Sequence, residues 1–122
     1  MATEDCAFCD IVTGRGRAVV VREWDDVVAI RPRGGVAEGH LLVLPRVHVA
    51  DAGSDPDVTA AVMRRAAELM AEHDDANLIT SRGAAATQTV FHLHVHVVPR
   101  RPGDGLALPW SAPEPVKEAA RG

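Results

Sequence analysis

Five short segments of the chain are rich in hydrophobic, mainly β-branched residues and are bounded by polar, glycine or proline positions. This pattern is typical of β-strands. The first two segments are separated by a very short polar turn, which predicts a hairpin. The third segment ends at Pro45, which has no N–H to donate to a strand ladder. The predicted strands are 18–23, 26–31, 40–45, 76–81 and 88–98.

One long segment, SDPDVTAAVMRRAAELMAEHDDAN (54–77), has the pattern of an amphipathic helix instead. Ser54 or Asp55 is suited to cap this helix, and Pro56 is suited to its first turn. The hydrophobic side is formed by Val58, Val62, Leu69 and Met70. A second, short helix is predicted over 6–12. Strands in hairpin order with one long helix predict an α+β domain, in which an antiparallel sheet of about five strands is covered on one side.

The last predicted strand contains three of the six histidines of the chain, in the stretch FHLHVHVV (91–98). Successive side chains of a strand point to opposite faces, so the histidines share one face and the intervening aliphatic residues share the other. A solvated strand face would more commonly carry Lys, Thr or Glu. We therefore predict that the aliphatic row packs into the core and that the histidine row faces a cleft or solvent. The histidine row is His92, His94 and His96.

Size and composition are those of a single globular domain, with 122 residues of which 47% are hydrophobic. No repeat or linker divides the chain, so we expect one domain over 1–122 with an irregular, proline-rich tail from about residue 99. The net charge of −4 and the lack of a basic run argue against binding of long nucleic acids, which requires clustered Lys and Arg. Small phosphorylated ligands need only a local group of donors and stay compatible with this composition.

The N-terminal sequence MATEDCAFCD is acidic and lacks the order of charged and hydrophobic residues found in a signal peptide. No hydrophobic run reaches the ~20 residues that cross a bilayer. We therefore expect a cytoplasmic protein without a membrane segment. Its two cysteines, Cys6 and Cys9, form a single C-x-x-C pair. In that compartment we expect their thiols to be reduced, metal-bound or redox-active.

The C-x-x-C pair predicts a structural zinc site if two further ligands arrive from elsewhere in the fold. His48, just past the strand that ends at Pro45, and His92, the first histidine of the row, are the candidates, which gives a closed Cys2His2 set. A thioredoxin-like redox pair is the competing interpretation. Such a pair normally opens a helix after a strand, however, and Cys6 has almost no chain before it.

His94 and His96, together with His40, remain for chemistry. Imidazole near pH 7 is both a nucleophile and a general acid or base. Neighbouring imidazoles tend to stay neutral, whereas an incoming phosphate favours the charged form as a donor. The row is thus suited to phosphoryl chemistry with one nucleophile and flanking donors. An alternative is a metal-dependent hydrolase, in which His92, His94 and His40 hold one ion that activates water.

Four blocks of the sequence resemble those of the histidine triad (HIT) family. One of them carries the family signature His-φ-His-φ-His-φ-φ, where φ is a hydrophobic residue. The blocks occur in family-like order and spacing over nearly the whole chain, and they resemble the zinc-containing, HINT-like members of the nucleotide hydrolase and transferase branch. They are CAFCDIVTG (6–14), GHLLVLPRVH (39–48), QTVFHLHVHVVPR (88–100) and GDGLALPW (103–110).

The resemblance implies an α+β homodimer that hydrolyses or transfers nucleoside monophosphate groups, with phosphoramidates or dinucleoside polyphosphates as substrates. It implies that His94 is the nucleophile, that a backbone carbonyl fixes its tautomer, and that water cleaves a nucleotidyl-histidine intermediate. His96 and His40 would contact the phosphate and assist the leaving group. No catalytic cofactor is implied. The positions that match the structural zinc ligands of the zinc-containing members are Cys6, Cys9, His48 and His92.

The resemblance also implies substrate contacts. Gln88 and Thr89 match positions that contact phosphate oxygens or the leaving group, and Ser81 begins the turn that is Asn-x-Gly in many members. Thr87 replaces a glycine beside the phosphate site, which predicts a stiffer loop. Trp110 matches an aromatic residue that approaches the partner subunit's active site, although it is equally suited to fill the core of its own chain.

The stretch AIRPRGG (29–35) lacks the acidic residue with which many members hold the ribose hydroxyls. Arg31 and Arg33 are expected to be solvated loop charges, so the sequence leaves base and sugar preference open. A nucleotide-binding module with little turnover is an alternative to the enzyme, because ligand-contact residues alone do not establish catalysis.

Overall fold

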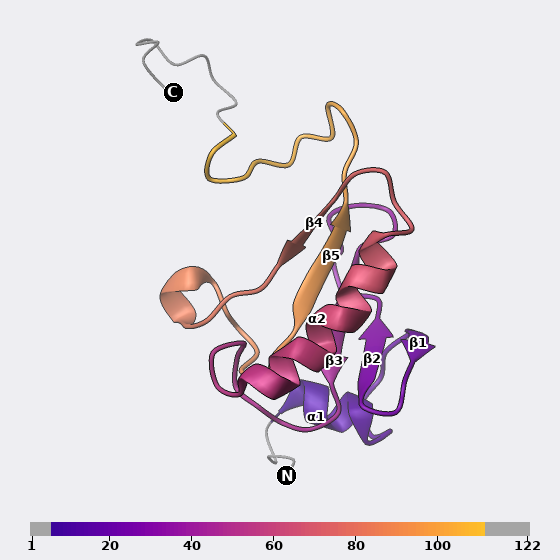
Figure 1. The fold of residues 1–122 in the computed structure, drawn as a ribbon, viewed down its shortest axis with the longest axis vertical. Helices are drawn as coiled ribbons and strands as arrows, with labels where there is room; N and C mark the ends of the chain where they lie inside the picture. Colours follow the sequence, from indigo (N-terminus) through magenta and orange to yellow (C-terminus); the bar gives the residue numbers. More distant parts are fainter. Residues whose placement is uncertain (1–5, 112–122) are drawn as a thin grey trace.

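The computed structural model describes residues 6–111. Its centre is a five-stranded antiparallel sheet with the strand order β1-β2-β3-β5-β4 (Figure 1). Two helices and one short 3₁₀ helix, η1, complete the fold, which confirms the predicted α+β class. The elements are α1 (Ala7–Val12), β1 (Val20–Glu23), β2 (Val27–Ile30), β3 (Leu41–Pro45), α2 (Pro56–Met70), β4 (Ala76–Ile79), η1 (Ala84–Ala86) and β5 (Val95–Pro99).

Helix α2 begins as predicted and ends earlier than predicted. The Asp55 side chain accepts hydrogen bonds from the Asp57 and Val58 N–H groups, and Pro56 occupies the first turn. The helix ends at Met70, because residues 71–75 bring no hydrophobic side chain to the sheet and instead turn the chain into β4. Figure 1 shows α2 lying across the sheet, and its buried side packs against β3 and β5.

The second face of the sheet is also covered, so the expectation of a sheet covered on one side is wrong. Helix α1, capped by Cys6, contributes Phe8 and Cys9 to a second, smaller core. In that core they meet Ile30 of β2 and Leu42 of β3. Every residue of β2 is buried because both faces of this strand are covered. The short helix therefore packs on the face of the sheet on which the histidines lie, where Phe8 contacts the rings of His92 and His94.

The histidine row is only partly a strand, which corrects the predicted range 88–98. The ladder with β3 begins at Val95, and the ladder with β4 begins at His96. Before these residues the chain bends at Val90 and His92 and pairs irregularly, for example through the Leu93 N–H, which donates to the Val49 carbonyl oxygen at 2.8 Å. The alternation nevertheless holds, since Leu93, Val95 and Val97 are buried in the core beneath α2.

Beyond β5, residues 100–111 form neither a helix nor a strand, and the rest of the predicted tail (112–122) lies outside the described residues. Among residues 6–111 there is no helix with the length and hydrophobicity needed to span a membrane.

Candidate functional site

Five of the six histidines of the sequence separate into two groups, and His73 belongs to neither. The Cys2His2 cluster consists of Cys6, Cys9, His48 and His92. The histidine cluster consists of His40, His94 and His96, whose rings are linked by contacts between neighbours: the centroids of His40 and His96 are 5.2 Å apart, and those of His94 and His96 are 5.3 Å apart. The structure thus brings together the residues that the sequence assigned to metal binding, and separately those assigned to chemistry.

The four ligand atoms of the Cys2His2 cluster lie within 4.8 Å of one another. The Nδ1 atom of His92 is 3.4 Å from the Cys6 Sγ and 3.5 Å from the Cys9 Sγ. The Nδ1 atom of His48 is 3.2 Å from the Cys9 Sγ. A tetrahedral ion with bonds of about 2.0–2.3 Å separates its ligand atoms by roughly 3.3–3.8 Å. These distances therefore fit a single four-coordinate metal ion.

The protonation of His92 also fits a metal ligand. Its Nε2 is 2.9 Å from the Pro45 carbonyl oxygen, so Nε2 carries the hydrogen and donates it, and Nδ1 keeps its lone pair toward the cysteines. Burial lowers the pKa of His92 to about 4, so the ring is neutral at pH 7. Burial raises the pKa of the Cys6 thiol, and a bound cation would offset that cost by stabilising the thiolate. Two sulfur and two imidazole donors are a set that zinc prefers.

His94 has the opposite tautomer to His92. Its Nδ1 is 2.8 Å from the carbonyl oxygen of His92, so the hydrogen is on Nδ1 and the lone pair is on Nε2. The ring of Phe8, from α1, meets His94 edge-on at a centroid distance of 5.0 Å. Burial lowers the pKa of His94 below its ordinary value, against the opposing effect of the carbonyl bond. The result is a neutral, half-buried imidazole with an available nucleophilic nitrogen.

His40 and His96 form a hydrogen-bonded pair, and their hydrogen bonds fix which nitrogen of each ring carries the hydrogen. The Val36 N–H donates to Nδ1 of His40 at 3.1 Å, so the hydrogen of neutral His40 is on Nε2. That Nε2 lies 3.0 Å from Nδ1 of His96, which must accept, so His96 carries its hydrogen on Nε2. Burial lowers the pKa of both rings, and for His96 the nearby His94 and His40 contribute as well, giving a value of about 4. His96 is thus a neutral N–H donor beside the His94 ring.

Gln88 is buried, with 5% of its surface exposed, and both ends of its side-chain amide bind backbone groups. Its Oε1 accepts from the Gly83 N–H at 2.8 Å, and its Nε2 donates to the carbonyl oxygens of Ala50 at 2.8 Å and Val90 at 3.1 Å. These three bonds hold the connection between β4 and β5 in shape and join it to the connection between β3 and α2. In this conformation the Gln88 amide supports the loops.

The loop that begins at Ser81 reaches Gln88 through η1 and Thr87. Ser81, at the start of this loop, is half-buried, and Thr89, directly after the buried Gln88, is exposed. Thr87 has φ = +73°, a left-handed conformation that a β-branched residue rarely adopts. Thr87 therefore occupies a backbone conformation that favours glycine, and the stiffer loop stays a prediction.

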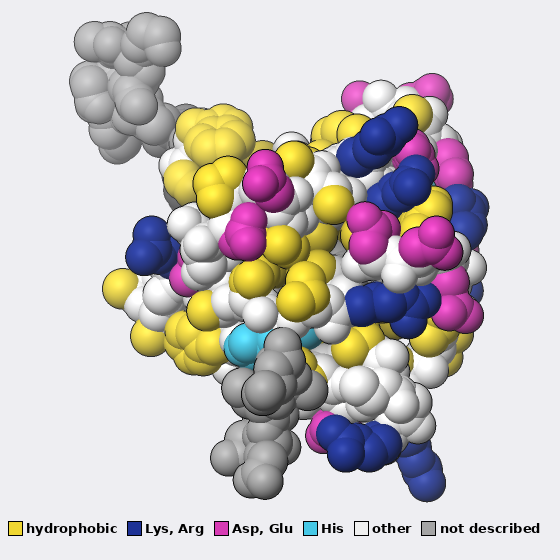
Figure 2. Space-filling model, turned by 60° about the horizontal axis from the view of Figure 1, so that its bottom comes forward, with side chains coloured by type: hydrophobic (Ala, Val, Ile, Leu, Met, Phe, Trp, Pro, Cys, Tyr) yellow, Lys and Arg dark blue, Asp and Glu magenta, His cyan; other side chains and the backbone are white. Residues whose placement is uncertain are grey.

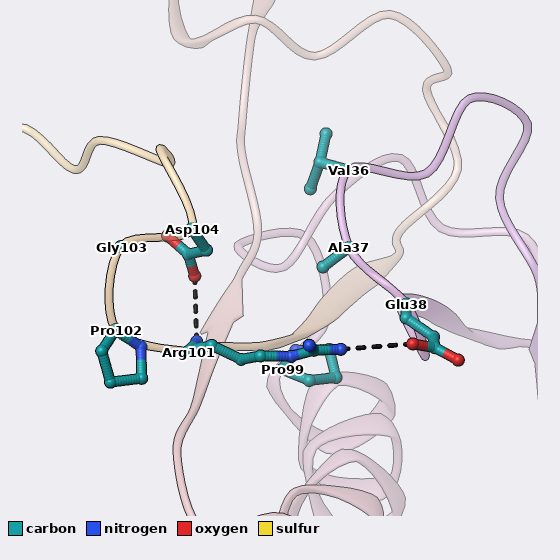
Figure 3. Close-up of a pocket in the computed structure, with 8 residues that line it drawn as sticks. All are labelled: Val36, Ala37, Glu38, Pro99, Arg101, Pro102, Gly103 and Asp104. Carbon is teal, nitrogen blue, oxygen red and sulfur yellow. Dashed lines mark hydrogen bonds and ion pairs between the residues drawn. The ribbon is translucent and has the colours of Figure 1, made fainter.

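Trp110 is 78% exposed, so it does not fill the core of its own chain, and its approach to a partner subunit stays a prediction. A cavity of about 260 Å³ lies at the end of β5 away from His94 (Figure 3). It is lined by residues 36–38, 99 and 101–104, and the ion pair between Glu38 and Arg101, 3.2 Å long, lies across it. None of the three histidines of the histidine cluster lines this cavity.

Figure 2 shows histidine side chains at the surface, with hydrophobic side chains close by. Two residues of this region were missed by the sequence reasoning. Phe8 lies between the two cysteines, and its place in C-A-F-C on a helix could have predicted a buried contact. The Val36 N–H that orients His40 belongs to the backbone, and its direction leaves no signal in the sequence.

The chain is similar to known proteins of one family. The family model of the HIT domain matches residues 14–103. Adenylylsulfatase HINT3 from Arabidopsis thaliana is 31% identical over 109 residues, a match that covers 84% of this chain and 55% of that protein. A Zn-bound histidine triad family protein from Mycobacterium smegmatis is 36% identical with a TM-score of 0.75, covering 84% of this chain and 80% of that one.

A HIT family protein from Bacillus anthracis aligns with a TM-score of 0.81 at 28% identity, covering 91% of this chain and 84% of that one. The family model spans most of the chain, and these solved relatives align with most of its fold. This chain therefore belongs to the histidine triad family.

Proposed function

We propose that the protein is a nucleotidyl hydrolase or transferase that acts at the α-phosphate of nucleoside 5′-phosphate derivatives, with His94 as the nucleophile. The observation that carries this proposal is the 2.8 Å contact between His94 Nδ1 and the His92 carbonyl oxygen. This bond fixes the tautomer in which Nε2 has a lone pair, and the lowered pKa keeps that lone pair free at neutral pH.

In the first step, the Nε2 lone pair of His94 attacks the α-phosphorus opposite the leaving group. A P–N bond forms as the bond to the leaving group breaks, and the leaving group takes the electron pair. The imidazole becomes positively charged, and its Nδ1–H still donates to the His92 carbonyl, which stabilises that charge. In the second step, water attacks phosphorus, the electron pair of the P–N bond returns to Nε2, and the proton of the attacking water passes to solvent.

His96 and His40 act on the phosphate in this scheme. The neutral tautomer of His96 supplies an N–H donor for a phosphate oxygen, and His40 holds that tautomer through the 3.0 Å contact with Nδ1. Ser81 and Thr89 supply further polar contacts from the loop beside them, while Gln88 sets the shape of that loop. Suitable substrates are nucleoside phosphoramidates and dinucleoside polyphosphates, because their reacting α-phosphates are alike.

Zinc is the metal proposed for Cys6, Cys9, His48 and His92, in a structural role. Bound zinc would add folding free energy and fix α1 to the chain just before β5. Since all four ligands come from the protein, the site has no open position for a reacting water. The relative from Mycobacterium smegmatis, whose title describes it as Zn-bound, supports this choice of metal.

We also propose a homodimer and a cytoplasmic location. β4 is an edge strand of the sheet, and Ile79 at its end is exposed, as is Trp110. Such features are suited to contact with a second copy. The cytoplasmic location is supported by the two free cysteines within a metal-binding cluster.

The metal-dependent alternative is not favoured by the geometry. Among residues 6–111, the Cys2His2 cluster is the one group of three or more possible ligands whose atoms converge. His92 belongs to it through Nδ1, and Nδ1 of His94 is bonded to a carbonyl. The alternative of a nucleotide-binding module with little turnover is decided by experiment.

The test is mass spectrometry of the intact protein, quenched milliseconds after mixing with adenosine 5′-phosphoramidate. The wild type should carry an AMP-sized adduct, and His94→Ala should carry none. His73→Ala is the matched control, because His73 is an exposed histidine outside both clusters, and it should behave as the wild type does. An adduct on His94→Ala would sink the assignment of the nucleophile. Nucleotide binding with neither adduct nor AMP release would favour the binding module.

A further inference from the structure

The backbone of His94 lies just outside the sheet on both sides. The ladder with β3 begins one residue later, at Val95, and the ladder with β4 begins two residues later, at His96. A residue at this position lacks the paired backbone bonds that hold the rest of β5. For a nucleophile this matters, because a displacement of about 1 Å at the reacting atom lowers rates by roughly 10²-fold.

A side chain just beyond the end of the neighbouring strand takes the place of the missing ladder bond. Thr80 directly follows Ile79, the last residue of β4, and its hydroxyl donates to the His94 carbonyl oxygen at 2.8 Å. That length is typical of a good O–H···O bond. His94 is then held twice, through its ring by the His92 carbonyl and through its main chain by Thr80.

We infer that Thr80 is a positioning residue, whose hydroxyl holds the His94 backbone in the place where the imidazole is aligned for attack. The inference rests on the proposed function of His94. Thr80 is exposed, so its hydroxyl has water as an alternative partner and adds little to the stability of the core. Its contribution is therefore expected in the alignment of His94 rather than in the folding of the domain.

Two substitutions at this position separate the hydroxyl from the shape of the side chain. Thr80→Val keeps the branched shape and removes the donor, whereas Thr80→Ser keeps the donor and removes a methyl group. Thr59→Val is the matched control elsewhere. The Thr59 hydroxyl also donates to a backbone carbonyl, that of Ala52 at 2.7 Å, but Thr59 lies in α2.

The kinetic readout is the separation of kcat from KM with adenosine 5′-phosphoramidate. Thr80→Val should lower kcat by roughly threefold to tenfold, the effect of one lost neutral hydrogen bond, with KM unchanged. Thr80→Ser should recover kcat to within about twofold of the wild type, and Thr59→Val should have no effect on kcat. A rise in KM with unchanged kcat would overturn the inference, because it would make Thr80 a substrate contact.

A second readout needs no substrate. In ¹⁵N NMR of histidine-labelled protein, the wild-type His94 ring should show one tautomer, with hydrogen on Nδ1. Thr80→Val should shift its two nitrogen signals toward averaged values, and Thr80→Ser should not. Unchanged signals in Thr80→Val would overturn the inference. If the wild type hydrolysed no nucleotide, the proposed function would fail, and the NMR comparison would still decide whether Thr80 orients His94.

Discussion

His92 and His94 belong to one row, two residues apart, yet their rings are arranged for opposite uses. In His92, the Pro45 carbonyl takes the hydrogen of Nε2, which leaves Nδ1 for the cysteines. In His94, the His92 carbonyl takes the hydrogen of Nδ1, which leaves Nε2 for a substrate. The comparison teaches that the nitrogen bound by a backbone carbonyl decides whether a histidine of this row is suited to hold a metal or to attack phosphorus.

Burial separates the two histidines further. His92 is completely buried between its ligand partners and the smaller core, while His94 is half-buried beside Phe8. Burial lowers the pKa of both rings, so both are neutral at pH 7. Neutrality is needed for metal binding and for nucleophilic attack alike. What distinguishes the two sites is thus the exposure and direction of the lone pair.

Among the substitutions that test this comparison, His94→Ala should have the largest effect on kcat. Loss of the nucleophile should lower kcat by a factor on the order of 10⁴ or more, because no other group in the site replaces its lone pair. The unfolding temperature should change little, since the ring is half-buried and the Cys2His2 cluster is intact. Steady-state kinetics and thermal unfolding, with His73→Ala as the control, check both parts. Retention of more than a tenth of kcat would rule out His94 as the nucleophile.

Cys9→Ser tests the other side of the comparison. It should remove bound zinc and destabilise the fold by roughly 3 kcal/mol or more, which corresponds to a fall of about 10 °C or more in unfolding temperature. Metal analysis of the purified variant and calorimetry provide the measurement. At a temperature where the variant is folded, kcat should fall far less than in His94→Ala. Equal metal content in the variant and the wild type would contradict the zinc assignment.

The sequence predicts the two clusters better than it predicts what holds them. The period of two in the histidine row, the C-x-x-C pair and the cap at Asp55 each follow from local rules, and they agree with the structure. The end of the strand ladder before Val95 does not follow from local rules, because it depends on which loop supplies partners to the preceding residues. The roles of Thr80 and Gln88 likewise cannot be predicted from one sequence, since such side chains bind solvent, substrate or backbone groups equally well.

Gln88→Leu sharpens the distinction between contacting a substrate and supporting a loop. The leucine would leave the Gly83 N–H and the carbonyl oxygens of Ala50 and Val90 without their partner, so we expect a loss of about 1–3 kcal/mol of stability. Chemical denaturation measures this loss, and Thr89→Val, at an exposed neighbouring position, should cost less than about 0.5 kcal/mol. Unchanged stability in Gln88→Leu, together with a raised KM, would instead make Gln88 a direct substrate contact.

The smallest effect concerns the pH dependence of stability at His96. Its pKa in the folded protein is about 4, below the ordinary value of 6.5, so His96 contributes its full stability above pH 6.5 and loses it as the pH falls toward 4. Burial of the ring lowers this pKa most, and the neighbouring imidazoles of His94 and His40 lower it further. Between pH 7.5 and pH 5 the wild type should therefore lose about 1–2 kcal/mol more stability than His96→Gln, after allowance for partial exposure. Urea denaturation of both proteins at each pH measures the difference. Parallel pH profiles would mean that His96 titrates normally, and that the contact with His40 does not keep it in the neutral form.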